Sequence, residues 1–206
     1  MTSVGGMFSG GRPATVQEDG SFELTGVRGP VLLTASAGGQ AAVLKSILRG
    51  SEDITTTPME LVGTERIGDV TIVLTRDTGR LEGTVTNSRG EPVPEATIVI
   101  FSDDPRRGTD GSPFTRTSRS YGPAALAAVP GATGPAAAAR APGQYQMPML
   151  VPGRYLVVAC DAGTEPMPTP EGAFLEKLRP LATSVTIAAG DPTKLDLTLS
   201  KVPVGG

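Results

Sequence analysis

Glycine and proline occur along the whole chain, and this constrains the fold more than any other feature of the sequence. There are 27 Gly and 19 Pro among 206 residues, and both residue types favour turns over the interior of long helices. We therefore expect many short elements joined by turns, which is typical of an all-β protein. The length favours two small domains, because domains usually contain about 100 to 150 residues.

The segment GRLEGTVTNSRGEPVPEATIVIFSDD, residues 79–104, has the pattern of two strands joined by a turn. Apolar or small residues alternate with polar ones over residues 80–86, which indicates a strand with one face buried. Residues 96–101 form a β-branched run that suits a strand covered on both faces. Prolines cannot donate to a ladder, so pairing of the second strand is expected to start at or after Glu95.

Further strands are predicted in the C-terminal half. Residues 143–161 read as a strand, a Pro-Gly turn and a strongly apolar strand, and residues 182–200 read as two more strands. Between them, the sequence Thr169-Pro170-Glu171 precedes a run with apolar residues at helical spacing. A threonine cap, a proline in the first position and an acid in the first turn predict one short helix near residues 170–179.

An internal repeat is present. DGSFELTGVRGPVLLTA (residues 19–35) aligns with PGQYQMPMLVPGRYLVVA (residues 142–159), and alternating segments end both copies, at residues 68–75 and 193–200. Two copies of one β module account for this pattern. Only about 18 weakly patterned residues precede the first copy, which is therefore expected to lack its opening strands. Either the chain starts late within that module, or the module borrows a strand from a neighbour.

The repeat predicts two domains. The polar link TRDTGR joins two apolar strands and places the boundary near Asp77 to Gly79. We expect a partial β-sandwich over residues 1–77 and a complete one over residues 78–206. The Ala/Pro/Gly-rich tract at residues 123–143 is expected to be a loop, since it has few side chains that could offset the entropy of ordering.

The composition excludes several classes of function. The chain has no histidine, which removes the usual general base near neutral pH and every site that needs imidazole. We expect no enzyme activity and no cofactor. A net charge of −3 gives no basic surface for a phosphate backbone, so no nucleic-acid partner is expected. No apolar run is long enough to cross a bilayer, and the first residues lack the pattern of a signal peptide.

Several motifs together resemble the carboxypeptidase regulatory-like domain. They are Gly83-Thr84-Val85, Gly90-Glu91-Pro92-Val93, Ala96-Thr97-Ile98-Val99, the Gly-x-Tyr/Phe strand and Pro152-Gly153-Arg154-Tyr155. The resemblance covers roughly residues 14 to 201. It implies tandem seven-stranded, transthyretin-like β-sandwiches, as in large exported bacterial proteins. Two positions depart from the family pattern: Glu95 stands where Gly is favoured, and Asn87 where Asp is common.

Acidic residues follow the strand at residues 96–101 and are the candidates for a metal site. Asp103, Asp104 and Asp110 could supply oxygen ligands to Ca²⁺. Their spacing matches no compact calcium loop, so no metal is expected. The alternative is that two adjacent acids end an edge strand, where charge discourages edge-to-edge pairing.

A sugar-binding surface is the second candidate site, and it would need exposed aromatic rings. The repeat assigns Tyr145 and Tyr155 to the core, which leaves Phe114 and Tyr121 as free rings. A loose basic cluster could contact an acidic glycan or a partner, although solvated loop charge is the commoner explanation; it consists of Arg106, Arg107, Arg116, Arg119 and Arg140. Cys160, the one cysteine, lies in an apolar strand and is expected to be a buried hydrophobe.

The function expected from these features is a non-catalytic structural or interaction module, a spacer or stalk, of an exported bacterial protein. The expected partners are neighbouring modules of a longer chain or of an envelope protein. The alternatives are a carbohydrate-binding module and an accessory domain of a peptidase. The resemblance implies an extracellular or periplasmic location.

Overall fold

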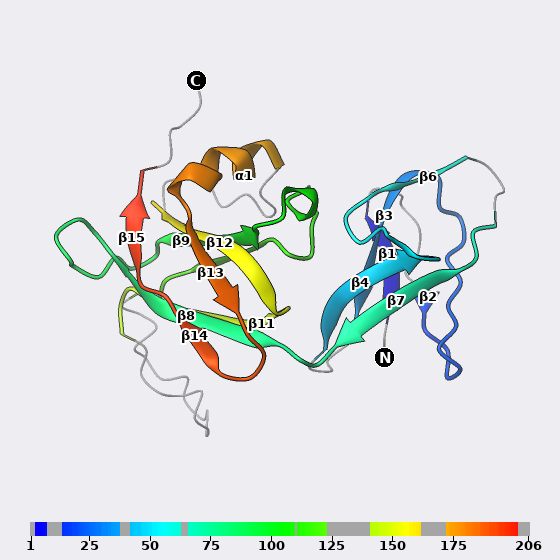
Figure 1. Cartoon of the computed structure of the whole chain (residues 1–206), viewed down its shortest axis with the longest axis horizontal. Coiled ribbons are helices and arrows are strands. Elements are labelled where there is room, and N and C mark those ends of the chain that lie inside the picture. The colour runs from blue at the N-terminus through cyan, green and yellow to red at the C-terminus, as the bar shows by residue number, and fades with distance from the viewer. Residues whose placement is uncertain are drawn as a thin grey trace. The chain divides into compact units, whose positions relative to one another are not determined.

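The computed structural model describes residues 3–7, 14–37, 42–62, 66–109, 111–122, 141–161 and 172–201 (Figure 1). Strands dominate this part of the chain, and it contains one α-helix, which confirms the all-β prediction. Two compact units are present: unit 1 comprises residues 1–78 with 111–113, and unit 2 comprises residues 79–110 with 114–206. Most of the predicted loop at 123–143 lies outside the described residues.

The described residues of unit 1 form two small sheets. One has the strand order β2-β1-β3-β6 and the other the order β5-β4-β7. The strands are β1 (Ser3–Met7), β2 (Ala14–Thr15), β3 (Gly29–Ser36), β4 (Val43–Arg49), β5 (Glu52–Asp53), β6 (Met59–Leu61) and β7 (Val70–Thr75).

The core of unit 1 is modest. Val31 and Leu33 on β3, Leu44 and Ile47 on β4, and Ile54 are buried in one cluster. Val31 and Leu33 share a face because side chains alternate along β3, and a register shift between Leu44 and Ser46 lets Leu44 and Ile47 of β4 reach the same cluster. Thr55 supports the core: its hydroxyl accepts a hydrogen bond of 2.8 Å from the Ile47 backbone amide.

The described residues of unit 2 form eight strands in one hydrogen-bonded network. The order is β10-β9-β12-β15-β8-β11, with β13 on β12 and β14 on β8. The segment at residues 182–200 gives β13 and then β14 and β15, which are two short parts of its last predicted strand. The bounds are β8 (Gly79–Thr86), β9 (Thr97–Ser102), β10 (Arg116–Arg119), β11 (Gln144–Leu150), β12 (Gly153–Cys160), β13 (Thr183–Ile187), β14 (Pro192–Lys194) and β15 (Leu197–Ser200).

Every residue of β9 is buried, as the sequence predicted for a strand covered on both faces. Side chains from β8, β9, β11, β12, β13 and β15 enclose the main core, which is the arrangement of a β-sandwich. On the other face of β9 and β12 lies a second cluster, which α1 (Gly172–Leu178) covers with Leu175 and Leu178. A helix is therefore present where one was predicted, and it lies beside the sheet (Figure 1). Its predicted cap, Thr169-Pro170-Glu171, lies outside the described residues.

Two tyrosines lie in the main core, as the repeat predicted. Tyr145 and Tyr155 are 2% and 4% exposed. Each hydroxyl donates to a backbone carbonyl, Tyr145 to Leu195 at 2.7 Å and Tyr155 to Val151 at 2.8 Å. Burial raises the pKa of Tyr155 to about 12, and it raises the pKa of Tyr145 further. Both rings are structural because their polar atoms are satisfied inside the protein.

The two departures from the family pattern have local explanations. Glu95 has φ of +60°, the left-handed conformation in which glycine is the most readily accommodated residue. The side-chain oxygen of Asn87 accepts from the backbone amides of Arg89 and Glu91, at 2.8 and 3.1 Å. An Asp carboxylate would accept the same two bonds, so Asn preserves the turn.

The second strand of this segment, β9, begins at Thr97, after the predicted limit at Glu95. An isolated bridge joins Pro92 to Thr86 before it.

Corresponding strands can be identified in the two units. β3 and β12 have the same length and align in the repeat, and each pairs antiparallel with a later strand, β6 or β13. β1 pairs with β3 in the register that β9 has with β12, and β2 flanks β1 as β10 flanks β9. Among the described residues, unit 1 has no strand that corresponds to β8. That these units are two copies of one module stays a prediction.

No helix in the described part of the chain is both long and apolar enough to cross a membrane.

Gly83 provides a test of the packing in unit 2. A Cβ at this position would clash with the Leu195 carbonyl oxygen, so the backbones of β8 and of the segment between β14 and β15 would have to separate. We expect Gly83→Ala to lower the free energy of unfolding by about 1–3 kcal/mol or more, measured by urea denaturation. The matched control is Gly153→Ala, whose added Cβ meets only the Tyr155 ring, at 3.8 Å. Equal stability of the two variants would contradict this packing.

Candidate functional site

The acidic pair Asp103-Asp104 follows β9 directly and precedes a short 3-10 helix, Pro105–Arg107. The expectation that these acids end an edge strand is wrong, because β9 lies between β10 and β12. The Asp103 amide continues the pairing with β12, since it donates to the Arg154 carbonyl at 3.1 Å. The two carboxylates therefore have roles other than protecting a sheet edge.

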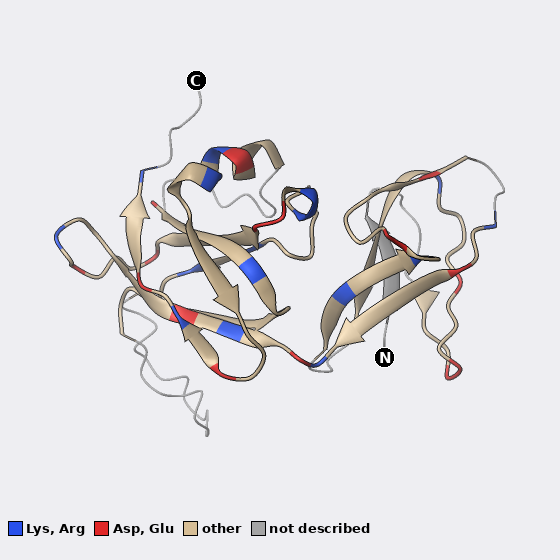
Figure 2. Ribbon diagram, viewed as in Figure 1, with Lys and Arg blue, Asp and Glu red and all other residues tan. Residues whose placement is uncertain are grey.

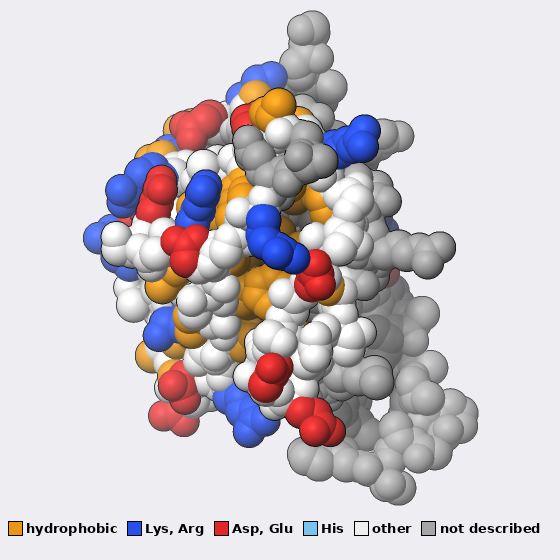
Figure 3. All heavy atoms as spheres, turned by 90° about the vertical axis from the view of Figure 1, so that its right-hand side faces the viewer, with side chains coloured by type: hydrophobic (Ala, Val, Ile, Leu, Met, Phe, Trp, Pro, Cys, Tyr) orange, Lys and Arg blue, Asp and Glu red, His pale blue; other side chains and the backbone are white. Residues whose placement is uncertain are grey.

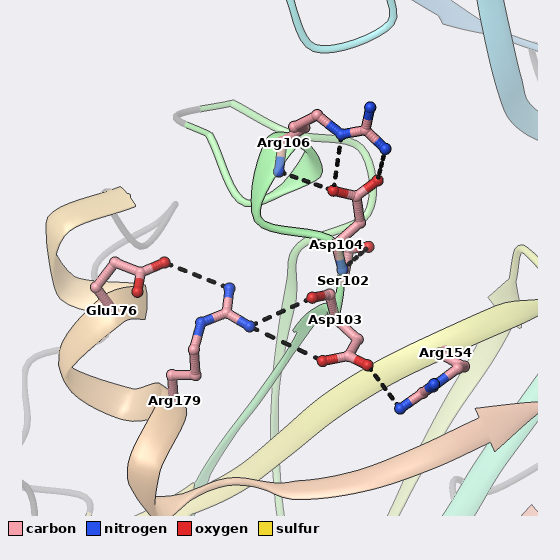
Figure 4. Close-up of polar contacts among 7 residues, drawn as sticks. All are labelled: Ser102, Asp103, Asp104, Arg106, Arg154, Glu176 and Arg179. Atoms are coloured by element: carbon pink, nitrogen blue, oxygen red, sulfur yellow. Dashed lines mark hydrogen bonds and ion pairs between the residues drawn. The ribbon is translucent and has the colours of Figure 1, made fainter.

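Asp103 is the centre of a set of ion pairs that joins three elements (Figure 4). Its carboxylate lies 3.0 Å from Arg154 on β12 and 3.9 Å from Arg179, which follows α1. Arg179 also donates to the Asp103 carbonyl at 3.3 Å and pairs with Glu176 at 3.3 Å. The guanidinium of Arg179 lies 5.8 Å from the centre of the Phe101 ring. These contacts attach the end of α1 to the end of β9.

Asp104 caps the 3-10 helix at Pro105–Arg107. Its Oδ1 accepts from the Arg106 backbone amide at 3.0 Å, and the carboxylate also pairs with the Arg106 guanidinium at 3.0 Å. Both interactions favour the ionised form. The hydrogen bonds from Arg106, side chain first and then backbone, hold the pKa of Asp104 below its ordinary value, and the charges of Arg106 and Arg107 add to this effect. The residue has the role of an N-cap.

The acids do not converge as metal ligands in the described residues. Asp103 and Asp104 face different arginines, so a cation would have to displace a guanidinium from each (Figure 4). The described part of the chain holds no group of three or more Asp, Glu, Cys or His side chains that could bind a metal ion. The third candidate, Asp110, lies outside the described residues.

The aromatic candidates are not both free. Phe114 is 3% exposed and belongs to the main core, so the expectation of a free ring is wrong there. Arg107 lies over its ring, 4.6 Å from the centre, at a small hollow of about 430 Å³ that Asp103 and Tyr155 also line. Tyr121 is half-buried, and its backbone exchanges hydrogen bonds with Gln144 and Gly143. A ligand role for Tyr121 stays a prediction.

The arginine candidates have separate surroundings. Arg116 donates to the Pro148 carbonyl at 3.1 Å, and burial lowers its pKa. Arg119 lies 3.9 Å from Glu95. Arg106 and Arg107 contact Asp104 and the Phe114 ring, as described above. Basic and acidic residues are interspersed in both units (Figure 2). Arg140 lies outside the described residues, and binding by Arg116 or Arg119 stays a prediction.

Cys160 is buried at the end of β12 and is 1% exposed. Burial raises the pKa of its thiol to about 11. Because the thiolate is the reactive form of cysteine, this thiol is poorly suited to nucleophilic chemistry near neutral pH.

The sequence did not identify the arginines that surround Asp103. Arg154 follows the Pro152-Gly153 turn, and Arg179 follows the last turn of α1. A basic residue after a helix is a known preference, because it complements the helix dipole. That signal could have marked Arg179 but not its partner, which is 76 residues away in the sequence.

No family model and no curated protein matches the chain. The solved structures that it resembles include the major pilin subunit BcpA of Bacillus cereus, with 13% identity and a TM-score of 0.32 over 63% of this chain and 31% of that one. The Bacillus anthracis TIE protein has 13% identity and a TM-score of 0.33 over 96% of this chain and 33% of that one. GBS52, the minor pilin of Streptococcus agalactiae, has 13% identity and a TM-score of 0.32, with 95% and 70% covered.

The chain spans about a third of the length of the first two structures. With TM-scores of this size, the likeness supports no conclusion about function. The resemblance to the carboxypeptidase regulatory-like domain stays a prediction.

The role of Asp104 can be tested through pH. Its lowered pKa means that the ionised carboxylate stabilises the fold above the ordinary aspartate range, and that this contribution is lost as the pH falls through the folded-state pKa. We expect Asp104→Ala to cost about 1 kcal/mol at pH 7, as for a lost helix cap, and Asp104→Asn to cost less because Asn also caps. Urea denaturation at pH 7 and at pH 2.5 should show the difference between parent and Asp104→Ala shrinking at the lower pH. A constant difference would show that the carboxylate charge is irrelevant.

Calcium addition tests the arrangement of both acids. A ligand that binds only the folded state raises its melting temperature by mass action. Because Asp103 and Asp104 are paired with arginines, we expect millimolar calcium to leave the melting temperature unchanged. A rise that the double variant Asp103→Ala/Asp104→Ala abolishes would contradict this expectation.

Proposed function

We propose that this chain is a non-catalytic structural or interaction module, a spacer or stalk, of an exported bacterial protein. The observation that carries the proposal is the pairing between the first and last strands of unit 2. β8 begins the unit, and it pairs parallel with β14 and β15, which end it. The exported location rests on the family resemblance.

Parallel pairing of terminal strands determines how a pulling force acts on unit 2. The pairs run from Arg80↔Pro192 to Thr86↔Thr198. The Leu195 amide donates to the Glu82 carbonyl at 2.9 Å, and the Thr84 amide donates to the Asp196 carboxylate at 2.8 Å. If the chain is stretched from both sides of the unit, the two strands slide along each other, and these bonds are loaded together rather than one after another. This geometry suits a module that carries tension.

Single-molecule pulling on the full chain tests the proposal. Cysteine handles at Asp77→Cys and Lys201→Cys apply the force along the terminal strands, which loads their hydrogen bonds together in shear. Handles at Ser88→Cys and Lys201→Cys apply the force at one end of the strand pair, which breaks the hydrogen bonds one after another. All three positions are exposed, and the buried Cys160 thiol has a pKa of about 11, so the added cysteines are labelled selectively. We expect the unfolding force of unit 2 to be several-fold higher in shear.

The two handle pairs share Lys201→Cys and differ only in which end of β8 is attached, so each is the control for the other. Equal forces in both directions would remove the support for a tension-bearing spacer.

A further inference from the structure

Residues 21–28 of unit 1 lie outside every strand that the structure describes. Phe22, Leu24 and Val27 alternate with exposed residues and are only half-buried. Leu24 and Val27 pack against the core of the unit. Residues 21–28 take part in no β-bridge within the described part of the chain. The segment thus has the side-chain pattern of a strand but no ladder.

The corresponding segment of unit 2 shows what is missing. The repeat places Phe22 opposite Tyr145 and Leu24 opposite Met147 in the alignment, and both of these β11 residues are buried. β11 pairs with β8, with Tyr145 facing Gly83 and Met147 facing Leu81. Unit 1 lacks a counterpart of β8 among its described residues. Residues 21–25 therefore have no such partner among the described residues.

β8 lies between two neighbours in unit 2: β11 on one side and β14 on the other. The alignment of residues 68–75 with 193–200 makes Ile67–Asp69 the counterpart of β14. β7, which follows, is already paired with β4 from Val70 to Thr75. Asp69 has φ of +56°, and its carbonyl accepts from the Gly50 amide at 3.1 Å, so the open positions on this side are Ile67 and Gly68.

A hollow occupies this place in unit 1. It has a volume of about 1040 Å³, and both Phe22–Leu24 and Ile67–Asp69 line it. Val31 and Leu33 of β3 and Met59 and Leu61 of β6 also line it. Figure 3 looks onto unit 1 and shows hydrophobic side chains in a band between charged ones. Two of the lining segments, Phe22–Leu24 and Ile67–Asp69, align in the sequence repeat with the strands that flank β8 in unit 2.

We propose that this hollow accepts a β-strand from another polypeptide, which pairs with residues 21–25 as β8 pairs with β11. The required sequence follows from the register. Leu24 needs an apolar residue opposite it, as at Leu81, and Phe22 needs a glycine, as at Gly83. This inference deepens the proposed interaction role and rests on it.

Charge distinguishes the accepted strand from β8 itself. Glu23 is exposed and is the counterpart of Gln146, which faces Glu82 in unit 2. If the accepted strand had the sequence of β8, its glutamate equivalent to Glu82 would lie opposite Glu23. Like charges directly opposite each other are destabilising. The accepted strand should carry Lys or Arg between its apolar residue and its glycine. Its pattern is apolar–basic–glycine–polar–apolar.

Peptide binding to the full chain tests the proposal. The probes are GRLKGTVT and GRLEGTVT, which correspond to residues 79–86 with and without Glu82→Lys, together with a scrambled peptide. We expect GRLKGTVT to bind several-fold more tightly than GRLEGTVT, measured by titration calorimetry, because the expected gain per cross-strand charge pair is about 0.2–1 kcal/mol. Hydrogen exchange should slow at residues 22–25 and 67–68.

A charge swap is the sharpest control. Glu23→Lys, at an exposed position, should reverse the preference to GRLEGTVT, and Leu24→Asp should abolish binding of both peptides. Absence of millimolar binding, protection elsewhere, or a preference that Glu23→Lys leaves unchanged would overturn the proposal. Protection of the same residues that appears without peptide and rises with protein concentration would also overturn it, in favour of self-association. Failure here leaves the spacer role intact, because the pulling experiment concerns unit 2 alone.

Discussion

The burial of β12 on both faces is the constraint on which unit 2 depends. All six residues from Tyr155 to Cys160 are buried, and they alternate between the main core and the cluster under α1. The same strand pairs with β9, β13 and β15. A strand in this position has to be apolar throughout, since neither face meets water. Its counterpart β3 in unit 1 has fewer buried residues, in keeping with the smaller core there.

The local sequence pattern predicted the strands well, but it did not predict which strands pair or which side chains meet. Alternation at residues 80–86 and the β-branched run at 96–101 depend only on nearby residues, and both strands formed where expected. The place of β9 between β10 and β12 depends on pairing between distant segments, which a period of two does not encode. The arginine partners of Asp103 could not be predicted for the same reason, because they come from β12 and from the end of α1.

Phe114 shows a second limit of reading the sequence. The ring lies outside any alternating segment, so no periodicity indicated its burial, yet it belongs to the main core with Arg107 over its face. Glu95 shows another limit, because its residue type gave no sign of its backbone conformation. A position where the resemblance favours glycine has a left-handed backbone, and the Glu95 amide is held by the Ser120 carbonyl at 3.2 Å. Surrounding hydrogen bonds can sustain such a conformation.

The positions of the tyrosines make the two units distinguishable by spectroscopy. The chain has no tryptophan and three tyrosines, Tyr121, Tyr145 and Tyr155, all of which belong to unit 2. Two of these rings are enclosed in the main core, with their hydroxyls bonded to backbone carbonyls. Intrinsic fluorescence and near-ultraviolet absorbance are therefore dominated by unit 2. Unfolding of unit 1 therefore changes the tyrosine fluorescence and absorbance little, whereas far-ultraviolet circular dichroism detects the strands of both units.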